Sequence, residues 1–153
     1  TAIVSGITSD EEVRLPLLRR RGFYTVNNEK ENMTTFLQDN ICTNHVDVVV
    51  ECSGAAQAIP QLMNCIRNGG TLTLLGLYSK LSEIDVTQMV RKELIIRSSC
   101  AYQWKNFEQA IHLLTSHDFK VKDLVAHYAP EDAEKAFEDA VRKKVLKPVF
   151  RFE

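Results

Sequence analysis

Apolar β-branched runs alternate along the chain with longer stretches that have apolar residues at helical spacing. The runs rich in Val, Ile, Leu and Thr predict strands at Ala2–Ser5, Tyr24–Asn27, Val46–Cys52, Thr71–Gly76 and Leu94–Ser99. Such alternation is typical of βαβ units that feed a parallel sheet buried on both faces. The predicted fold class is therefore α/β, with a doubly wound parallel sheet.

Two helices are predicted between these strands. Ser9 to Glu12 matches a capping box, and Pro16 then either kinks the helix or stands in the first turn of a restarted one. Ala55–Asn68 has apolar residues at mixed three and four spacings, and the Gly69-Gly70 pair that follows predicts its end.

The pattern changes after Ser99. We predict helices at Asn106–Ser116 and Glu131–Lys143, a short strand at Val125–Tyr128 between them, and a terminal strand at Lys147–Phe152. This tail need not belong to the same sheet as the earlier strands.

Charge and hydropathy exclude two classes of partner. The 153 residues include 19 Lys and Arg and 20 Asp and Glu, a net charge of −1, so no basic field attracts nucleic acid or an anionic membrane. Apolar runs such as Val46–Val50 are far shorter than the ~20 residues of a spanning helix. We expect one compact domain in a cytoplasmic protein, and the opening Thr1-Ala2-Ile3, a strand already in progress, suggests a piece of a longer chain.

The four cysteines, Cys42, Cys52, Cys65 and Cys100, have no CxxC spacing. We therefore expect neither a zinc knuckle nor a disulfide framework, but reduced and mostly buried thiols.

Small residues and glycines follow three of the predicted strands. They stand at Ser5–Thr8, Cys52–Gly54 and Leu75–Tyr78. Ligands of open parallel sheets bind beyond the carboxyl ends of the strands, where glycines let a flat ligand approach the backbone. A single glycine of this kind is explained better by a tight turn, but three in register favour a ligand site whose edge is formed by Gly6, Gly54 and Gly76.

Two motifs give a specific resemblance. Val46–Ala55 reads DVVVECSGA after its first valine, and Asn68–Gly76 contains GGTLTLLG. Together they resemble the DVVxECxG and GGxxxxxG strands of zinc-dependent medium-chain dehydrogenases. Arg91–Ser99 with Tyr102 and Phe107 is similar to the sorbitol dehydrogenase branch, and the similarity runs through Ala133–Phe137 to Leu146–Val149.

The resemblance implies a Rossmann-type sheet and a set of cofactor contacts. Gly6, Ile7 and Thr8 would lie beside the adenosine ribose, Cys52, Ser53 and Gly54 on the adenine side, and Leu75, Gly76 and Leu77 at the nicotinamide end. Ser99, Cys100 and Ala101 would lie near the carboxamide, and Lys147 against the pyrophosphate. From its spacing alone, Lys147 is explained equally well as a lysine exposed to solvent beside a terminal strand.

Gly6 departs from the family pattern in a way that affects the choice between NAD and NADP. Members that use NAD have an acid at this position to bind the ribose 2′-OH. Without it, Thr8, Ser9 or Arg14 could bind a 2′-phosphate, so we expect the intact enzyme to accept NADP at least as readily as NAD. Cys100-Ala101 stands where the sorbitol branch has Phe-Arg, which argues against a sorbitol-specific enzyme.

The resemblance also implies parts that this sequence lacks. It contains no GxGxxG turn, and His45, His112, His117 and His127 have no ligand spacing, so the zinc of the intact enzyme is expected to be held elsewhere. Residues 1–116 would form the dinucleotide-binding domain without its first strand, and residues 117–153 a tail that packs on the catalytic domain. We predict no catalytic and no metal residue here, and an inactive isolated chain.

The resemblance implies an oxidoreductase that transfers hydride between a secondary alcohol, such as a polyol or sugar derivative, and NAD or NADP. A non-catalytic nucleotide-binding α/β domain is the alternative, and a methyltransferase fits the GGxxxxxG strand less well. Leu81–Val86 alternates apolar and polar residues, which predicts an edge strand. Because members of the family commonly pair through such an edge, we expect a homodimer or homotetramer.

Overall fold

The computed structural model describes residues 1–116 and 121–152. The chain divides into two compact units, one formed by Thr1–Glu31 with Tyr102–Glu153, the other by Asn32–Ala101. Within the described residues the strands form three parallel sheets, with the orders β1-β2, β3-β4-β5 and β6-β7.

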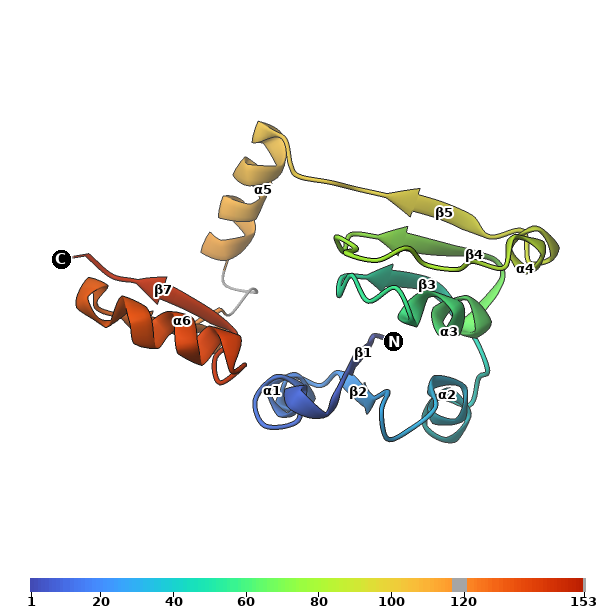
Figure 1. The fold of residues 1–153 in the computed structure, drawn as a ribbon, viewed down its shortest axis with the longest axis horizontal. Coiled ribbons are helices and arrows are strands. Elements are labelled where there is room, and N and C mark those ends of the chain that lie inside the picture. Colours follow the sequence, from blue (N-terminus) through green and yellow to red (C-terminus); the bar gives the residue numbers. More distant parts are fainter. Residues whose placement is uncertain (117–120, 153) are drawn as a thin grey trace. The chain divides into compact units, whose positions relative to one another are not determined.

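The second unit is a three-stranded parallel sheet with helices between its strands (Figure 1). Its elements are α2 (Met33–Ile41), β3 (Val46–Glu51), α3 (Ala58–Cys65), β4 (Ile66–Leu74), α4 (Val86–Arg91) and β5 (Ile95–Ser98). Every connection joins parallel neighbours, so the carboxyl ends of all three strands lie at the same edge.

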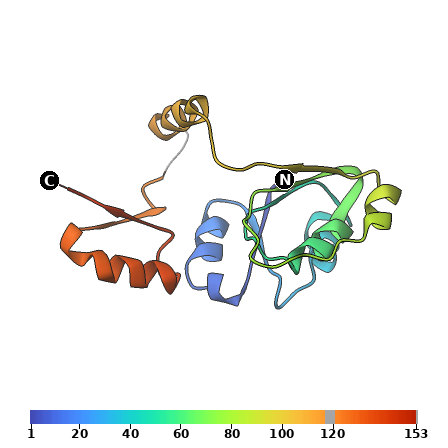
Figure 2. The same ribbon diagram turned by 45° about the horizontal axis from the view of Figure 1, so that its top comes forward.

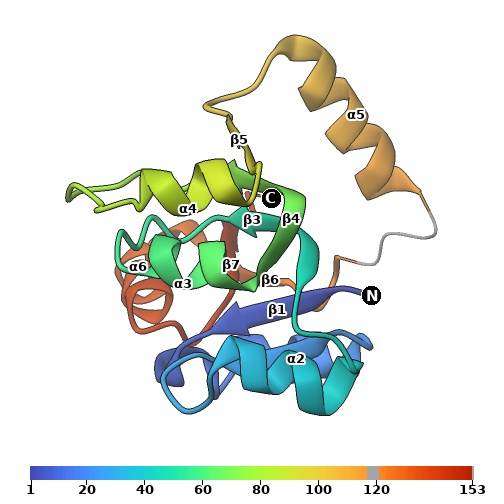
Figure 3. The same cartoon turned by 90° about the vertical axis from the view of Figure 1, so that its right-hand side faces the viewer.

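One face of this sheet is closed by α3 and α4. Ile59 and Met63 of α3 pack on Ile66 and Leu72 of β4, and Met89 of α4 joins this cluster. Figure 3 shows α3 beside β3 and β4. The opposite face is open within the unit, since Val48 and Val50 of β3 remain more than half exposed.

The first unit begins with a βαβ element. Its parts are β1 (Ile3–Gly6), the 3-10 turn η1 (Thr8–Asp10), α1 (Arg14–Arg20) and β2 (Tyr24–Asn27). The strands pair in parallel from Ile3 with Tyr24 to Gly6 with Asn27, and Leu15 and Leu17 of α1 are buried.

The remaining elements of the first unit follow residue 101. They are α5 (Trp104–Thr115), β6 (Val125–Tyr128), the 3-10 turn η2 (Pro130–Asp132), α6 (Ala133–Val141) and β7 (Lys147–Phe150). Figure 2 shows α6 alongside β7, and β6 pairs with β7 in parallel. Lys143, just after α6, donates to Ser9 Oγ (2.7 Å) and Asp10 Oδ1 (3.2 Å), and Arg21 pairs with Asp123.

Two predicted helices have different bounds in the structure. Ser9 is not a cap, because its hydroxyl accepts from Lys143 instead, but the restarted helix is confirmed: α1 begins at Arg14, with Pro16 in its first turn. The helix predicted to run to Asn68 ends at Cys65, and Gly69-Gly70 lies within β4. There β4 bulges between the pairs Val46–Ile66 and Val48–Thr71, which explains the glycines: a Cβ on Gly70 would stand 2.3 Å from Ile66 Cγ2.

The edge strand predicted at Leu81–Val86 does not form. Residues 81–85 are irregular, and α4 begins at Val86. Side chains decide this outcome: Ser82 Oγ donates to the carbonyl of Ala56 (2.8 Å), and Asp85 caps α4 by accepting from Gln88 N–H (3.0 Å). The alternation of apolar and polar residues in Leu81–Val86 therefore has another cause: its polar residues include Ser82, which bonds to the backbone, and Asp85, which caps a helix.

Across residues 1–116 and 121–152, no helix has both the length and the apolar character that crossing a membrane requires.

Candidate functional site

Three predicted site segments lie at one edge of the β3-β4-β5 sheet. Residues 52–54 follow β3, residues 75–77 follow β4, and residues 99–101 come directly after β5. Because these strands are parallel neighbours, the structure brings the three turns together, with the 75–77 turn in the middle. Most of their side chains are exposed, among them Cys52, Ser53, Leu75, Leu77 and Cys100.

The first two turns touch through their glycines. Gly54 has a φ of +70°, and a Cβ there would lie 2.3 Å from the carbonyl oxygen of Leu77. A Cβ on Gly76 would lie 2.3 Å from the nitrogen of Gly54. These glycines were predicted for close approach of a ligand, but the structure gives another reason: each lets the other turn approach.

Beneath these turns lies Glu51, a residue to which the sequence analysis gave no role. Its carboxylate accepts from Ser53 N–H (2.7 Å), Gly54 N–H (3.2 Å) and the hydroxyls of Ser53 and Tyr78. Its carbonyl accepts from Leu75 N–H (2.8 Å) and Gly76 N–H (3.2 Å). The sequence signal that could have revealed Glu51 is a glutamate at the end of a run of valines, because a charged residue is rare and costly in a buried strand.

Hydrogen bonding sets the protonation of this pair. Burial alone would raise the pKa of Glu51, but the donors from Ser53, Tyr78 and Gly54 outweigh it and lower that pKa, so Glu51 is ionised at neutral pH. Burial and the bond to Glu51 raise the pKa of Tyr78, which keeps its phenol protonated as a donor.

A few backbone N–H groups at this edge remain available. Those of Ser53, Gly54, Leu75, Gly76 and Ser99 all bond within the unit. Those of Leu77, Cys100 and Ala101 donate to no acceptor in the described ranges. Ala101 also has a φ of +59°, uncommon for a residue with a Cβ. These three N–H groups can therefore bind a ligand's carbonyl or amide group.

Gly6, Ile7 and Thr8 lie at the carboxyl end of β1 in the other unit. Ile7 N–H donates to Asp10 Oδ2 (3.0 Å), and a Cβ on Gly6 would lie 3.0 Å from Leu15 and 3.1 Å from Asp10. Gly6 is thus explained locally by crowding against α1 and η1. Its placement at one edge with Gly54 and Gly76 stays a prediction.

Charged groups surround the turn after β1. Arg14, one of three candidates for a 2′-phosphate contact and equally explained as an ordinary helix residue, pairs with Asp10 (3.2 Å). The carboxylate of Glu29, which the sequence analysis overlooked, accepts from Thr8 N–H (2.8 Å). Glu29 belongs to the turn after β2, so only the parallel pairing of β1 and β2 brings it here. Lys147 is exposed at the start of β7.

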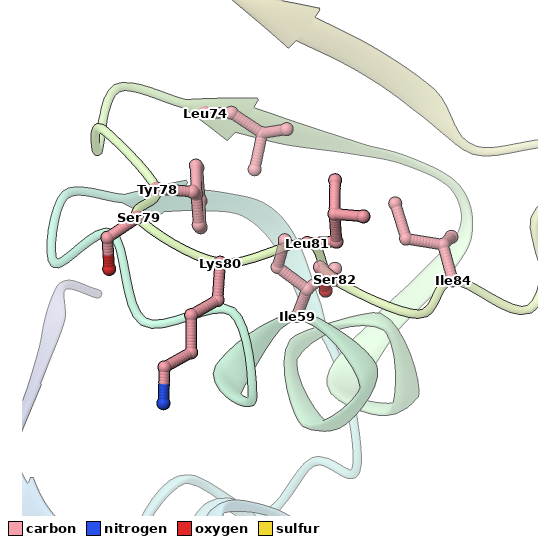
Figure 4. A pocket seen from close by; sticks show the side chains of 8 residues that line it. All are labelled: Ile59, Leu74, Tyr78, Ser79, Lys80, Leu81, Ser82 and Ile84. Carbon is pink, nitrogen blue, oxygen red and sulfur yellow. The ribbon is translucent and has the colours of Figure 1, made fainter.

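An open, mainly apolar hollow of about 440 Å³ lies on the α3 side of the second unit (Figure 4). It is lined by Ile59, Leu74, Tyr78, Ser79, Lys80, Leu81, Ser82 and Ile84. Tyr78 thus connects the hollow with Glu51 and the two turns.

No group of three His, Cys, Asp or Glu side chains in the described part of the chain could hold a metal ion. His117 lies outside the described residues. All four cysteines are free, but the expectation that most are buried was wrong: only Cys65 is buried, and Cys42, Cys52 and Cys100 are exposed. Cys52 and Cys100 are exposed because they stand in turns at the strand ends.

Comparison with known proteins identifies the family. Residues 2–116 match the family model described as zinc-binding dehydrogenase. The chain belongs to this family. Sorbitol dehydrogenase 1 of Saccharomyces cerevisiae is 30% identical over 96 residues, 62% of this chain and 27% of that protein. Sorbitol dehydrogenase of Halalkalibacterium halodurans is 26% identical over 140 residues, 90% of this chain and 40% of that protein.

Solved structures of zinc-binding dehydrogenases share the fold. An alcohol dehydrogenase zinc-binding domain protein from Burkholderia ambifaria superposes with a TM-score of 0.85 at 22% identity, over 100% of this chain and 42% of that one. The chain spans less than half the length of these relatives. The predicted medium-chain dehydrogenase family and the α/β fold with parallel strands are thereby confirmed.

Proposed function

We propose that the chain is the dinucleotide-binding portion of an oxidoreductase that transfers hydride between a secondary alcohol, a polyol or sugar derivative, and NAD or NADP. The observation that carries the proposal is the gathering of three exposed turns, residues 52–54, 75–77 and 99–101, at one edge of a parallel sheet in a chain of this family. Ligands of such sheets bind at this edge.

Each turn offers a different kind of contact. Cys52, Ser53 and Gly54 would cover the adenine side, while Leu75, Gly76 and Leu77 would meet the nicotinamide ring. The unbonded N–H groups of Leu77, Cys100 and Ala101 suit the carbonyl of the carboxamide. In the other unit, Gly6, Ile7 and Thr8 would face the ribose, and Lys147 the pyrophosphate.

The bound dinucleotide supplies the hydride acceptor. The residues of this chain bind it, orient it, and leave one face of the nicotinamide to the substrate. Zinc belongs to our proposal for the intact enzyme, but the described residues do not fit a zinc site, so we assign them no step that involves the metal.

The tail, residues 117–153, is proposed to pack on a catalytic domain in the intact enzyme. The substrate alcohol, and assembly as a homodimer or homotetramer, belong to that enzyme as well. The exposed free thiols of Cys42, Cys52 and Cys100 fit a reducing compartment, which supports a cytoplasmic location.

Enzyme assays on the intact protein and on the 153-residue chain test the proposal. A panel of alcohols and polyols with NAD and NADP, monitored by formation of the reduced cofactor, should give turnover with the intact protein alone. The isolated chain should bind dinucleotide without turnover, and a zinc chelator should abolish turnover by the intact enzyme while leaving binding by the chain unchanged. Binding without turnover by the intact protein would favour a non-catalytic nucleotide-binding domain, and failure to bind either dinucleotide would refute the proposal.

A further inference from the structure

Glu51 is a buried anion without a cationic partner in the described part of the chain. The residue is 4% exposed, and none of the ion pairs among the described residues includes it. A buried charge is costly unless hydrogen bonds compensate it. Here the compensation comes from donors in the two turns at the cofactor edge.

The carboxylate draws its donors from both turns. Oε1 accepts from the N–H (2.7 Å) and the hydroxyl of Ser53, and Gly54 N–H is 3.2 Å from both carboxylate oxygens. Oε2 accepts from the hydroxyl of Tyr78, which follows the 75–77 turn. One side chain therefore holds the segment after β3 and the segment after β4.

The backbone of Glu51 reinforces this connection. Its carbonyl accepts from Leu75 N–H (2.8 Å) and Gly76 N–H (3.2 Å), and a Cβ on Gly76 would lie 2.6 Å from Glu51 Oε2. The two turns therefore cannot shift independently, because Gly54 and Gly76 also touch.

We infer that Glu51 is the positioning residue of the dinucleotide site, which fixes the 52–54 turn and the 75–78 segment in one shape that binds both halves of the cofactor. The inference rests on the proposed function. Glu51 has no contact with the cofactor in this role; it acts through Ser53, Gly54, Gly76 and Tyr78.

The chemistry requires a carboxylate rather than an amide. Every polar group directed at the Glu51 side chain is a donor, and an ionised carboxylate is an acceptor at both oxygens. In Glu51→Gln the amide NH2 cannot accept from the N–H groups of Ser53 and Gly54; if it turns toward Tyr78 instead, the hydroxyl must accept rather than donate, and in either case the charge that strengthens these hydrogen bonds is lost. Tyr78→Phe and Ser53→Ala remove one donor each and leave the charge in place.

Ligand binding by the intact protein tests the inference. We would titrate wild type, Glu51→Gln, Tyr78→Phe and Ser53→Ala with NADH and with ADP-ribose, at a temperature where circular dichroism shows each protein folded. Glu83→Gln is the matched control, because Glu83 is an exposed glutamate of the same unit. Glu51→Gln should raise both dissociation constants by about tenfold or more, as expected when a charged group loses a hydrogen bond. The control should stay within about twofold of wild type.

A purely structural role for Glu51 would lower the unfolding temperature and leave the affinities of the folded protein unchanged. Binding of both ligands by folded Glu51→Gln at wild-type strength therefore overturns the inference. If that variant does not fold, Tyr78→Phe and Ser53→Ala decide: weaker binding supports the inference, and unchanged binding by both refutes it.

Amide hydrogen exchange separates this inference from the proposed function. If wild type binds neither ligand, the proposed function fails, and exchange then tests the positioning role by itself. Glu51→Gln should accelerate exchange at Ser53, Gly54, Leu75 and Gly76 and leave β4 protected. Unchanged exchange at these four residues would show that Glu51 does not hold the turns.

Discussion

The carboxylate of Glu29 stands at the turn where the family pattern places an acid and this chain has Gly6. Its hydrogen bonds with the side chain and N–H of Thr8 lower the pKa of Glu29, so the group is anionic at neutral pH. A carboxylate near the ribose repels a 2′-phosphate and can accept from a 2′-OH. Glu29 can therefore supply, from the turn after β2, the acid that is missing at the end of β1.

Removing this charge should shift the intact enzyme toward NADP. In Glu29→Gln, the ratio of kcat/KM for NAD to that for NADP should fall roughly tenfold, about 1.4 kcal/mol of transition-state preference. Steady-state kinetics with both cofactors measures the ratio, and Glu31→Gln, an exposed neighbour, is the control. An unchanged ratio would mean that Glu29 does not face the ribose.

The same assay tests the expectation drawn from Gly6. Gly6 by itself predicts that wild type uses NADP at least as readily as NAD, whereas an acid supplied by Glu29 predicts a preference for NAD. A specificity constant for NAD more than ~100-fold higher, about 2.7 kcal/mol, would show that another group replaces the missing acid, and Glu29 is the group that the structure offers.

Asp10 should make the stability of the first unit depend on pH. Burial alone would raise the pKa of Asp10, but the hydrogen bond from Ile7 and the charges of Lys143 and Arg14 outweigh it and lower that pKa below its ordinary 3.8. A carboxylate with a lower pKa in the folded state stabilises the fold above its unfolded pKa, and this contribution is lost as the pH falls through the folded pKa.

Urea unfolding of the isolated chain over a range of acidic and neutral pH checks this dependence. Asp10→Asn should lower the free energy of unfolding by about 2 kcal/mol near neutral pH, as expected for hydrogen bonds to a charged group. The difference from wild type should shrink as the pH falls below 3.8, the ordinary aspartate pKa. A difference that does not change with pH would show that the charge of Asp10 contributes nothing.

At the scale of helices and strands, α2 ends on a residue that suits its position poorly. Cys42 follows Ile41 in the left-handed conformation, with φ 58° and ψ 36°, and its N–H donates to the carbonyl of Leu37. Glycine adopts this conformation without the strain that a Cβ brings.

Cys42→Gly should therefore stabilise the chain by about 0.5–1 kcal/mol, which corresponds to roughly 1–4 °C in Tm for a chain of this size. Thermal unfolding followed by circular dichroism measures the shift. Cys42→Ala also removes the exposed thiol but keeps the Cβ, so it should not raise Tm. A rise of the same size in both variants would attribute the effect to the thiol.

Strands were predictable from the sequence because they are short runs of β-branched and other apolar residues. Tyr24–Asn27 and Val125–Tyr128 match their predicted bounds, and Val46–Cys52 differs from β3 by one residue. Helix ends were not predictable where a side chain forms a hydrogen bond with a backbone N–H group and so sets the end of the helix. The short helix α2 was missed, since its start depends on Asn32, whose side chain accepts from Thr34 N–H (2.8 Å).

Only the parts of the candidate site that directly follow a strand were predictable from the sequence. Residues 52–54 and 75–77 follow neighbouring parallel strands, as the sequence predicted, whereas Ser99–Ala101 entered through the family resemblance alone, and cofactor binding by all three segments stays a prediction. Glu51, Tyr78 and Glu29 were missed, because their roles depend on contacts between segments distant in sequence. Glu51 and Tyr78 are 27 positions apart in the sequence, a separation that local sequence patterns do not reveal.

At the scale of the whole molecule, each unit forms its own parallel sheets. The strands pair in parallel as β1-β2 in the first unit and as β3-β4-β5 in the second, as expected for βαβ units. Within the described residues, β1 and β3 each pair with a strand on one side alone.

Exposed apolar side chains in residues 81–90 suggest where copies of the intact protein contact each other. The predicted edge strand is absent, but the same segment exposes apolar side chains: Leu81 is fully exposed, and Val86 and Val90 are 63% and 71% exposed. Val86 and Val90 are four residues apart on α4, so they share a face of that helix. An isologous contact between two copies would bury these side chains and remove an exposed apolar surface.

We expect the intact protein to be a homodimer or homotetramer and Leu81→Lys and Ile84→Lys to shift it toward a smaller species, because a lysine is costly to bury at a subunit contact. Multi-angle light scattering over a series of protein concentrations measures the mass. Asn44→Lys adds the same charge at an exposed polar site of the same unit and should leave the assembly intact. A monomeric wild type would refute the predicted assembly, whereas an oligomer indifferent to both lysines would place the contact on another surface.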